Sequence, residues 1–242
     1  MRALFRVLVA LAYLIAASAA QAGFVINSFQ FAVAGGTPAS ITFLQCSSED
    51  ASNSTAYTFA SQNVGVASAD RWNLISVHSV DSATVYGVNS VTVAGDSAAE
   101  VIDFDGATAR NMALYMFNNV SGTSEDIVVT HSEAVTSSQV CLWQINNITS
   151  GTAVASAAAA ASGTTDASIN VSAFGVAAGG CVTVAAPSYT VTGLTERYDP
   201  GLGSEQGVYA ADYTNAGTAD SPLSIIFTAS SGGGTCATAS FL

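Results

Sequence analysis

Short apolar runs separated by turn residues repeat along most of the chain. The runs are rich in Val, Ile, Thr, Tyr and Phe, and the stretches between them are rich in Gly, Asn, Asp and Ser. Because no apolar period of 3.6 residues is sustained, the pattern predicts strands and little helix. The expected strands are Phe24–Phe31, Ser40–Cys46, Thr55–Ala60, Arg71–Val80, Val85–Ala94, Glu100–Phe104, Asn111–Asn118, Asp126–His131, Gln139–Ile145, Ser168–Ala173, Cys181–Ala186, Tyr189–Leu194, Gly207–Tyr213, Leu223–Thr228 and Thr235–Phe241.

Alternation within the runs indicates which faces are covered. In the run 223–228, Leu223, Ile225 and Phe227 share one side, which is typical of a strand with one face in water. The run 111–118 is apolar on both sides, which indicates a strand covered on both faces. Two sheets packed face to face account for both patterns. We therefore predict an all-β fold, a two-sheet β-sandwich of jelly-roll or immunoglobulin-like type.

The first 22 residues have the three-part pattern of a secretory signal peptide. Arg2 and Arg6 flank the start of an apolar run, Val7–Ala17, and small residues follow up to the Ala-Gln-Ala sequence at 20–22. We predict cleavage after this site, because the run is too short to span a bilayer with its flanks and the A-x-A pattern fits. A retained N-terminal membrane helix is the alternative. No integral membrane span is expected in the remaining residues 23–242, where no second apolar stretch approaches about 18 residues.

One segment departs from the strand pattern. Residues 153–161 read AVASAAAAA, and SGTTD follows them. Alanine favours helix, but so short a run is marginal in water unless it is packed. We interpret the region near 150–166 as a low-complexity connection that divides the chain into two parts, with one helical turn as the alternative. Residues 23–242 still fit a single β-sandwich domain.

Composition narrows the function classes. Of 242 residues only 9% are charged, and the five basic residues are all arginines, against 17 Asp and Glu. A chain without lysine has no Schiff-base or P-loop lysine, and so few cations cannot neutralise a phosphate backbone, so we expect no nucleic-acid partner. Cleavage of the signal peptide removes two of the five positive charges and takes the formal net charge from −12 to −14.

The four cysteines are Cys46, Cys141, Cys181 and Cys236. An even number in an exported chain predicts two disulfides, and buried free thiols are the alternative. Cys46 and Cys236 lie in early and late apolar segments, and terminal strands are often neighbours in a β-sandwich. We therefore favour Cys46–Cys236 with Cys141–Cys181. The lack of a CxxC pair and the presence of only two histidines give a structural zinc site little support.

The sequence gives little support for a catalytic site. His78 shares a strand side with Trp72, Leu74 and Ser76, and His131 follows apolar strand positions. No G-x-S-x-G elbow accompanies either histidine. We expect structural roles for both, assign no catalytic residue and predict no enzyme. A hydrolase with an unrecognised site is the lesser alternative.

Three acidic residues form a candidate cation site in the sequence EVIDFDG. Asp103 and Asp105 point to the same side of an extended segment, Glu100 precedes them, and Gly106 offers a turn. Their oxygens are suited to Ca²⁺, but only a fragment of the EF-hand pattern is present. A solvated strand end is therefore the favoured interpretation, with Ca²⁺ as the alternative and no other cofactor expected.

The most distinctive local sequence is Thr192–Pro200. Arg197 lies there between Glu196 and Asp199, next to Tyr198. Its guanidinium can clamp an anionic or sugar ligand, and the tyrosine ring offers a stacking face. An internal salt bridge that pins the loop is the favoured interpretation, because one Arg beside two carboxylates is already neutralised.

A carbohydrate-binding site would require aromatic side chains exposed on one face or at one loop end. Trp72, Tyr198, Tyr209 and Tyr213 are the candidates. Trp143 alternates with apolar neighbours along its strand and is expected in the core. Together with Arg197, the three tyrosines are the ligand-binding residues that the sequence favours.

Several motifs resemble a group of small β-rich proteins. They occur in this order: DRWNLISVH (70–78), NSVTVAG (89–95), VSGTSEDIVVT (120–130), VCLWQI (140–145), AAGGCVTVA (177–185) and TGLTERYD (192–199). The series, which covers most of residues 55–200, is similar to uncharacterised proteins of tailed-phage, prophage and alphaproteobacterial genomes. The resemblance implies a virion-associated or surface structural role and no reaction. A signal peptide departs from that pattern, since a virion protein assembled in the cytoplasm does not need one.

Three hypotheses therefore stay open. The first is an exported, non-enzymatic surface or virion-associated module, structural or adhesive, whose partners are other surface or virion proteins. The second is a lectin-like carbohydrate-binding module with glycan partners. The third is the hydrolase with an unrecognised site. For all three we expect a secreted, periplasmic or cell-surface location, with virion association as the alternative.

Export gives a direct test. We expect the exported protein to begin at Gly23, because signal peptidase cuts after a small-x-small site. N-terminal sequencing and intact mass of protein recovered outside the cytoplasm check this. Recovery from the cytoplasm with Met1 in place contradicts the export prediction.

Overall fold

The structure is a computed structural model. The residues that it describes are 37–49, 53–81, 86–106, 109–118, 121–183, 189–199 and 207–242. Residues from Pro38 to Leu242 form one compact unit. The predicted signal peptide and the predicted strand Phe24–Phe31 lie outside the described residues.

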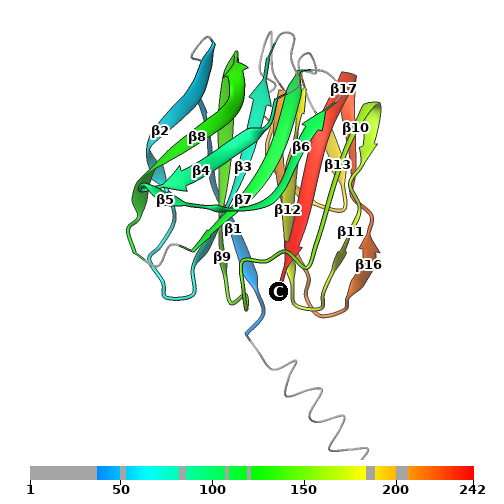
Figure 1. The fold of residues 1–242 in the computed structure, drawn as a ribbon. Coiled ribbons are helices and arrows are strands. Elements are labelled where there is room, and N and C mark those ends of the chain that lie inside the picture. The colour runs from blue at the N-terminus through cyan, green and yellow to red at the C-terminus, as the bar shows by residue number, and fades with distance from the viewer. Residues whose placement is uncertain are drawn as a thin grey trace, which may run out of the picture. The chain divides into compact units, whose positions relative to one another are not determined.

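The strands form four antiparallel sheets (Figure 1). The central sheet has the order β1-β9-β3-β7-β6, and its strands are β1 (Ser40–Glu49), β3 (Trp72–Val80), β6 (Ala99–Gly106), β7 (Arg110–Asn118) and β9 (Ser137–Asn146). The N-terminal outer sheet has the order β2-β8-β4-β5, with β2 (Ser54–Asn63), β4 (Val88–Val93), β5 (Asp96–Ser97) and β8 (Ser124–Val135).

The other two sheets come from the second part of the chain. The C-terminal sheet has the order β10-β17-β12-β15-β14, with β13 also paired to β17. Its strands are β10 (Ala155–Asp166), β12 (Val176–Thr183), β13 (Tyr189–Thr192), β14 (Thr195–Tyr198), β15 (Gly207–Thr214) and β17 (Ile226–Phe241). The small sheet pairs β11 (Ile169–Val171) with β16 (Asp220–Leu223).

The central sheet is covered on both faces. Along β3 and β9, Leu74 and Trp143 point into the core shared with the C-terminal sheet, and Ile75 and Leu142 point into the core shared with the N-terminal outer sheet. All four side chains are closed to solvent, and each contributes roughly 1.5–3 kcal/mol by burial. A third core lies on the far face of the C-terminal sheet, where Ile169 and Val171 of the small sheet belong to it.

The all-β prediction is confirmed, and no described residue is helical. The number of sheets differs from the prediction. Four sheets stand where two were expected, because the strands that are apolar on both sides belong to a middle layer with a sheet on each face. All strands of the central and N-terminal outer sheets lie within residues 40–146, and all strands of the other two lie within 155–241. The layers therefore follow the order of the chain.

The alanine-rich segment is a strand, which corrects the predicted connection near 150–166. β10 pairs with β17 from Ala155 opposite Ser240 to Asp166 opposite Ile226. It is the terminal strand of its sheet, so most of its small side chains stay at least partly exposed and give no alternating apolar signal. Pairing with a long neighbouring strand decides its conformation here, against the local helix preference of alanine.

Both disulfides join directly opposite residues of neighbouring strands. Cys46 of β1 bonds Cys141 of β9, and Cys181 of β12 bonds Cys236 of β17, with Cα atoms 4.0 and 4.1 Å apart. The favoured pairing Cys46–Cys236 with Cys141–Cys181 is therefore wrong. The first and last strands are not neighbours, because β1 lies at the edge of the central sheet and β17 inside the C-terminal sheet. Each part of the chain has its own disulfide.

Removing either disulfide is expected to destabilise the fold. The bonded residues are 95 and 55 positions apart, so loop-closure entropy predicts losses of about 4–5 and about 4 kcal/mol. Urea unfolding of the C46S/C141S and C181S/C236S variants measures this. Non-reducing peptide mapping of the native protein is the control, and a peptide that links Cys46 to Cys236 would contradict the pairing.

Candidate functional site

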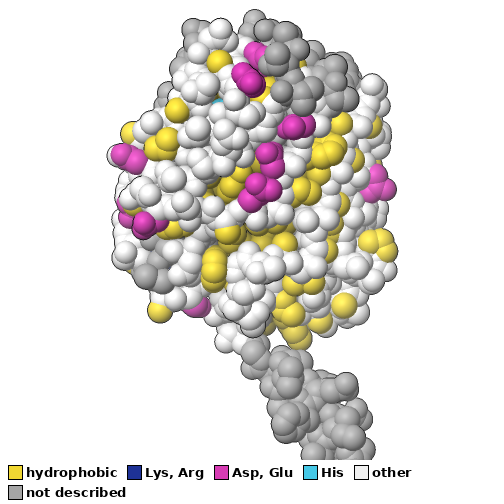
Figure 2. Space-filling view, in the orientation of Figure 1, with side chains coloured by type: hydrophobic (Ala, Val, Ile, Leu, Met, Phe, Trp, Pro, Cys, Tyr) yellow, Lys and Arg dark blue, Asp and Glu magenta, His cyan; other side chains and the backbone are white. Residues whose placement is uncertain are grey.

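Acidic side chains follow β6 on the face of the molecule drawn in Figure 2. The acidic residues of this strand are Glu100, Asp103 and Asp105. Hydrophobic side chains gather next to them, and no Lys or Arg is visible among the described residues of this face. The face therefore combines apolar surface with negative charge.

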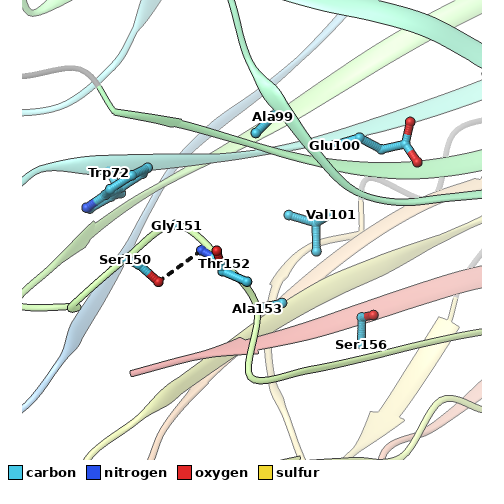
Figure 3. Close-up of a pocket in the computed structure, with 9 residues that line it drawn as sticks. All are labelled: Trp72, Ala99, Glu100, Val101, Ser150, Gly151, Thr152, Ala153 and Ser156. Carbon is cyan, nitrogen blue, oxygen red and sulfur yellow. Dashed lines mark hydrogen bonds between the residues drawn. The ribbon is translucent and has the colours of Figure 1, made fainter.

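A groove of about 420 Å³ opens at this strand and is the main candidate binding site (Figure 3). Its walls come from Trp72 at the start of β3, from residues 99–101 of β6 and from the segment 150–156 that leads into β10. The lining residues are Trp72, Ala99, Glu100, Val101, Ser150, Gly151, Thr152, Ala153 and Ser156. The volume lies within the range of small-ligand sites.

Trp72 provides the aromatic wall of the groove. Its side chain is half-buried and packs against the core between the central and C-terminal sheets. Gly151 lies against its six-membered ring, since a Cβ on this glycine would stand 2.3 Å from Cζ3 of Trp72. Figure 3 shows the indole nitrogen turned away from the other lining residues. A carbon edge of the ring therefore borders the groove.

The rest of the lining is apolar with hydroxyl groups. Val101 and Ala153 are half-buried and pack against the same core as Trp72. Ser150 and Ser156 are exposed. The carboxylate of Glu100 points away from the other labelled side chains (Figure 3). An aromatic edge, aliphatic groups and hydroxyls together suit a ligand with an apolar face and a hydroxyl-bearing rim, which is the chemistry of a sugar ring.

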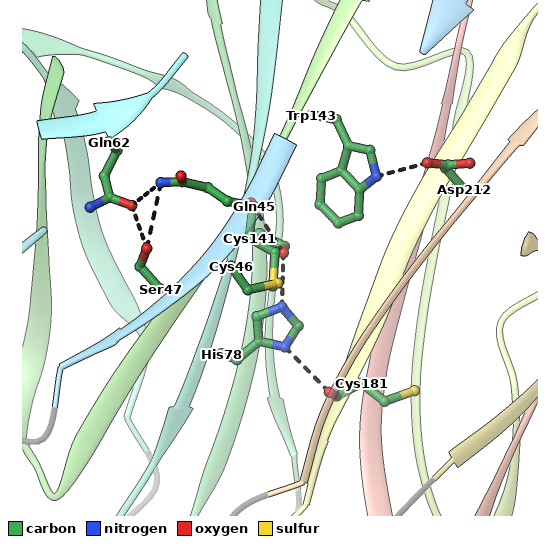
Figure 4. Close-up of a disulfide and its surroundings, with 10 residues drawn as sticks. Gln45, Cys46, Ser47, Gln62, His78, Cys141, Trp143, Cys181 and Asp212 are labelled. Carbon is green, nitrogen blue, oxygen red and sulfur yellow. Dashed lines mark hydrogen bonds between the residues drawn. A yellow bond between two sulfur atoms is a disulfide. The ribbon is translucent and has the colours of Figure 1, made fainter. Parts of the chain in front are cut away.

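Arg197 forms an ion pair with Asp212, a buried residue outside its own loop. Its Nε donates to both carboxylate oxygens of Asp212 at 2.9 Å, and its Nη2 lies 2.8 Å from Oδ1. Asp212 is buried on β15 and also accepts a hydrogen bond from Nε1 of Trp143 at 3.1 Å (Figure 4). The hydrogen bonds that Arg197 donates to the Asp212 carboxylate raise the pKa of Arg197. The sequence predicts a salt bridge within the loop, whereas the structure pairs Arg197 with Asp212 of the neighbouring strand β15, a partner that the local sequence does not reveal.

The three candidate tyrosines do not share an exposed face. Tyr209 is closed to solvent, with its hydroxyl 3.5 Å from Oε2 of Glu196. Tyr213 is half-buried and donates to Oδ2 of Asp220 at 2.9 Å. Tyr198 packs partly buried against the core between the central and C-terminal sheets. The three tyrosine rings are therefore held by burial, by core packing or by a hydrogen bond, and they do not form a shared binding face.

Two of the three candidate calcium ligands come together. Asp103 and Asp105 both accept hydrogen bonds from the side-chain amide of Asn111 on β7, at 2.5 and 2.9 Å. The register shift between Glu100 and Ile102 places Glu100 opposite Tyr115 and Asp103 opposite Ala113, so Glu100 lies on the same face as the two aspartates but further along the strand. No group of three or more His, Cys, Asp or Glu side chains suited to a metal ion occurs in the part of the chain that the structure describes.

Both histidines are buried. His78 lies between the central and C-terminal sheets, where its Nε2 is 2.8 Å from Oγ of Ser76 and its Nδ1 is 3.3 Å from the carbonyl oxygen of Cys181 (Figure 4). His131 lies 3.3 Å from Oγ of Ser138. Burial lowers the pKa of His78 to about 3 and that of His131 to about 4. Both imidazoles are therefore neutral at physiological pH.

Residues that the sequence analysis missed include the groove segment 150–153 and Asn111. Gly151 gives no signal by itself, because its role depends on a tryptophan far away in the sequence. Asn111 opens an apolar strand, and its position directly opposite Asp105 is visible only from the β6–β7 register. Among the described residues no helix is long and apolar enough to cross a membrane.

Comparisons with known proteins find only distant structural likeness. The chain matches no protein-family model and no curated protein. Dimeric latent PorU from Porphyromonas gingivalis is 12% identical over 79% of this chain, with a TM-score of 0.28, and the match spans 20% of the PorU chain. The conserved protein of unknown function PA5104 from Pseudomonas aeruginosa PAO1 is 13% identical, with coverage of 83% and 98% and a TM-score of 0.25.

A third solved structure is that of Red Clover Necrotic Mosaic Virus. It is 10% identical, with coverage of 84% of this chain and 96% of that chain and a TM-score of 0.24. At TM-scores this low, none of the three likenesses carries an argument about fold or function.

Mutation of Arg197 tests how much its ion pair with Asp212 contributes to stability. We expect R197A to lower the free energy of unfolding by about 1–3 kcal/mol, because it leaves the buried Asp212 carboxylate without its charged partner. The 40% exposure of the arginine side chain keeps the loss below that of a fully buried pair. Urea unfolding of R197A and of R197A/D212N checks this. If the double variant is no more stable than R197A, the pair does not hold the charge as described.

Proposed function

We propose that the protein is an exported, non-enzymatic β-sheet module that works by binding at a cell or virion surface. The single observation that carries the proposal is that the described strands form stacked layers around three apolar cores. The contact of Ser76 with His78 and the contact of Ser138 with His131 both resemble catalytic chemistry, and all four of these side chains are buried. Other surface or virion proteins, or glycans, are the proposed partners.

The disulfides support the export part of the proposal. Both bonds form between directly opposed cysteines, and disulfides persist in oxidising compartments outside the cytoplasm. They agree with the signal peptide pattern of the sequence. These two features support the proposed location in the periplasm, at the cell surface or in the medium, with a virion surface as the alternative.

A lectin-like function is the second candidate, and the groove favours it. The carbon edge of Trp72 can contact the C–H face of a sugar ring, while Ser150, Thr152 and Ser156 offer hydroxyls to the ring substituents. This groove replaces the Arg197 region as the proposed glycan site, since Arg197 is engaged by Asp212 and Tyr209 is buried.

Binding to glycan arrays and to whole cells tests the proposal. Ser156 and Ser162 are both exposed serines of β10, but only Ser156 lines the groove. We expect S156W to fill the groove and reduce binding at least tenfold, while S162W binds like the native protein. W72A should lose binding as well, because it removes the aromatic wall.

Two results would count against the proposal in different ways. Equal binding by S156W and S162W would exclude the groove as the site. No binding of the native protein to any glycan or cell surface would contradict the binding function itself. Unfolding curves for all three variants establish that each is folded.

A further inference from the structure

The groove lies beside the edges of two sheets. Among the described strands, β6 ends the central sheet and pairs only with β7, and β10 ends the C-terminal sheet and pairs only with β17. Residues 99–101 of β6 line one side of the groove, and residues 150–156, which lead into β10, line the other (Figure 3). The outward N–H and C=O groups of a terminal strand can pair with a further strand. The groove is therefore bordered by two strands to which another chain can add.

β6 carries the features by which proteins block such an edge. Its pairing with β7 shifts register between Glu100 and Ile102, which is the mark of a β-bulge. It also carries three acidic side chains, those of Glu100, Asp103 and Asp105. A bulge and charged side chains both hinder the pairing of a further strand. Strand addition at β6 is therefore disfavoured.

β10 is unprotected from Ala155 to Ser162. This stretch reads ASAAAAAS, with no charged residue and no proline. It pairs with β17 residue by residue, and the first register shift comes after Ser162. Other terminal strands differ, since β2 has two register shifts in its pairing with β8, and β1 and β14 contain charged residues. Proteins normally protect a long edge, so an unprotected one indicates a pairing partner.

The groove offers a place for one side chain of an added strand. Ala158 packs against the core between the central and C-terminal sheets, and Ser156, two residues earlier on the same face of β10, lines the groove. A strand added beside β10 presents every second side chain on this face. The carbon edge of Trp72 and the methyl groups of Val101 and Ala153 suit an apolar or aromatic side chain there.

The charge of the molecule selects the kind of partner. Glu100 is the one ionisable residue among those that line the groove, and it is exposed. The chain has a formal net charge of −12 and no lysine, and no Lys or Arg is visible on the described part of this face (Figure 2). The carboxylates of Asp103 and Asp105 are held by Asn111 and are not part of the site, but they add to the negative potential along β6. A positively charged segment is therefore attracted, whereas a second copy of this chain is repelled.

We propose that the groove and the open edge of β10 bind an extended, positively charged segment of a partner protein, which adds to the C-terminal sheet as a further strand. Main-chain hydrogen bonds to residues 155–162 supply affinity, and an apolar side chain in the groove with a Lys or Arg beside Glu100 supplies specificity. The inference rests on the proposed surface-binding function and names a protein as the partner. A glycan in the groove is the competing outcome, since a sugar ring can contact Trp72 but leaves the edge of β10 unpaired.

Binding of synthetic octapeptides to the full exported chain tests the proposal. We expect the native protein to bind the basic peptide TKTFTKTV and to bind its acidic match TETFTETV at least tenfold more weakly. A strand forms its hydrogen bonds to one neighbour through alternate residues. Methylation of one alternate set of backbone nitrogens in TKTFTKTV should therefore weaken binding at least tenfold, while methylation of the other set should not.

Protein variants and hydrogen exchange locate the peptide. E100K reverses the charge at the groove and should weaken binding of TKTFTKTV at least tenfold. E133K makes the same change at an exposed residue of β8 and should bind like the native protein. Bound peptide should slow amide hydrogen exchange in residues 155–162, because outward N–H groups become hydrogen-bonded, and should leave exchange in β2 unchanged.

Each contrary result has a distinct meaning. Equal binding of the two methylated peptides, or unchanged exchange in β10, would overturn strand addition. Equal binding by E100K and E133K would exclude the groove. A native protein that binds glycans or cells but not TKTFTKTV would overturn the inference and leave the proposed function standing, whereas no binding to peptides, glycans or cells would contradict both. Unfolding curves establish that both variants are folded.

Discussion

Burial of the central sheet on both faces is the constraint on which the other layers depend. Its middle strands leave no face for water, so each of their side chains must be apolar or hydrogen-bonded within the protein. Leu74 and Trp143 serve one core, and Ile75 and Leu142 serve the other. Asn73 meets this requirement with its Nδ2, which donates to the carbonyl oxygen of Val64 at 3.0 Å, but not with its buried Oδ1, which has no hydrogen-bond partner. The N-terminal outer sheet and the C-terminal sheet therefore each close one face of the central sheet that would otherwise expose apolar side chains to water.

Hydrogen bonds fix how the central sheet and the C-terminal sheet are aligned against each other. His78 contacts the carbonyl oxygen of Cys181 and, through Ser76, reaches the strand of Cys141. Trp143 donates to Asp212 across the same interface. Apolar packing has no direction, whereas a hydrogen bond between named atoms fixes one alignment of the sheets. The backbone of one cysteine from each disulfide therefore lies within a short hydrogen-bond chain.

Most strands are predictable from alternation, because turn residues bound them and their burial follows from local composition. β10 is not predictable in this way, because its alanines do not alternate with polar residues and its strand conformation depends on pairing with β17. The number of layers and the disulfide partners also depend on which strands are neighbours, and a single sequence does not contain that. The candidate sites divide in the same way. Asp103 and Asp105 are visible as a pair, but Asn111 and Gly151 acquire their roles from strands and rings distant in sequence.

The position of β17 near the end of the sequence affects the order in which the sheets can form when the chain is synthesised from its N-terminus. It pairs with β10, β12 and β13, so the C-terminal sheet lacks its shared strand until residues 226–241 are available. The strands of the other two large sheets are complete by residue 146. During the interval between these points, Leu74 and Trp143 face water rather than their partners. Newly made protein is therefore most prone to association while its first half is folded and its last strand is still missing.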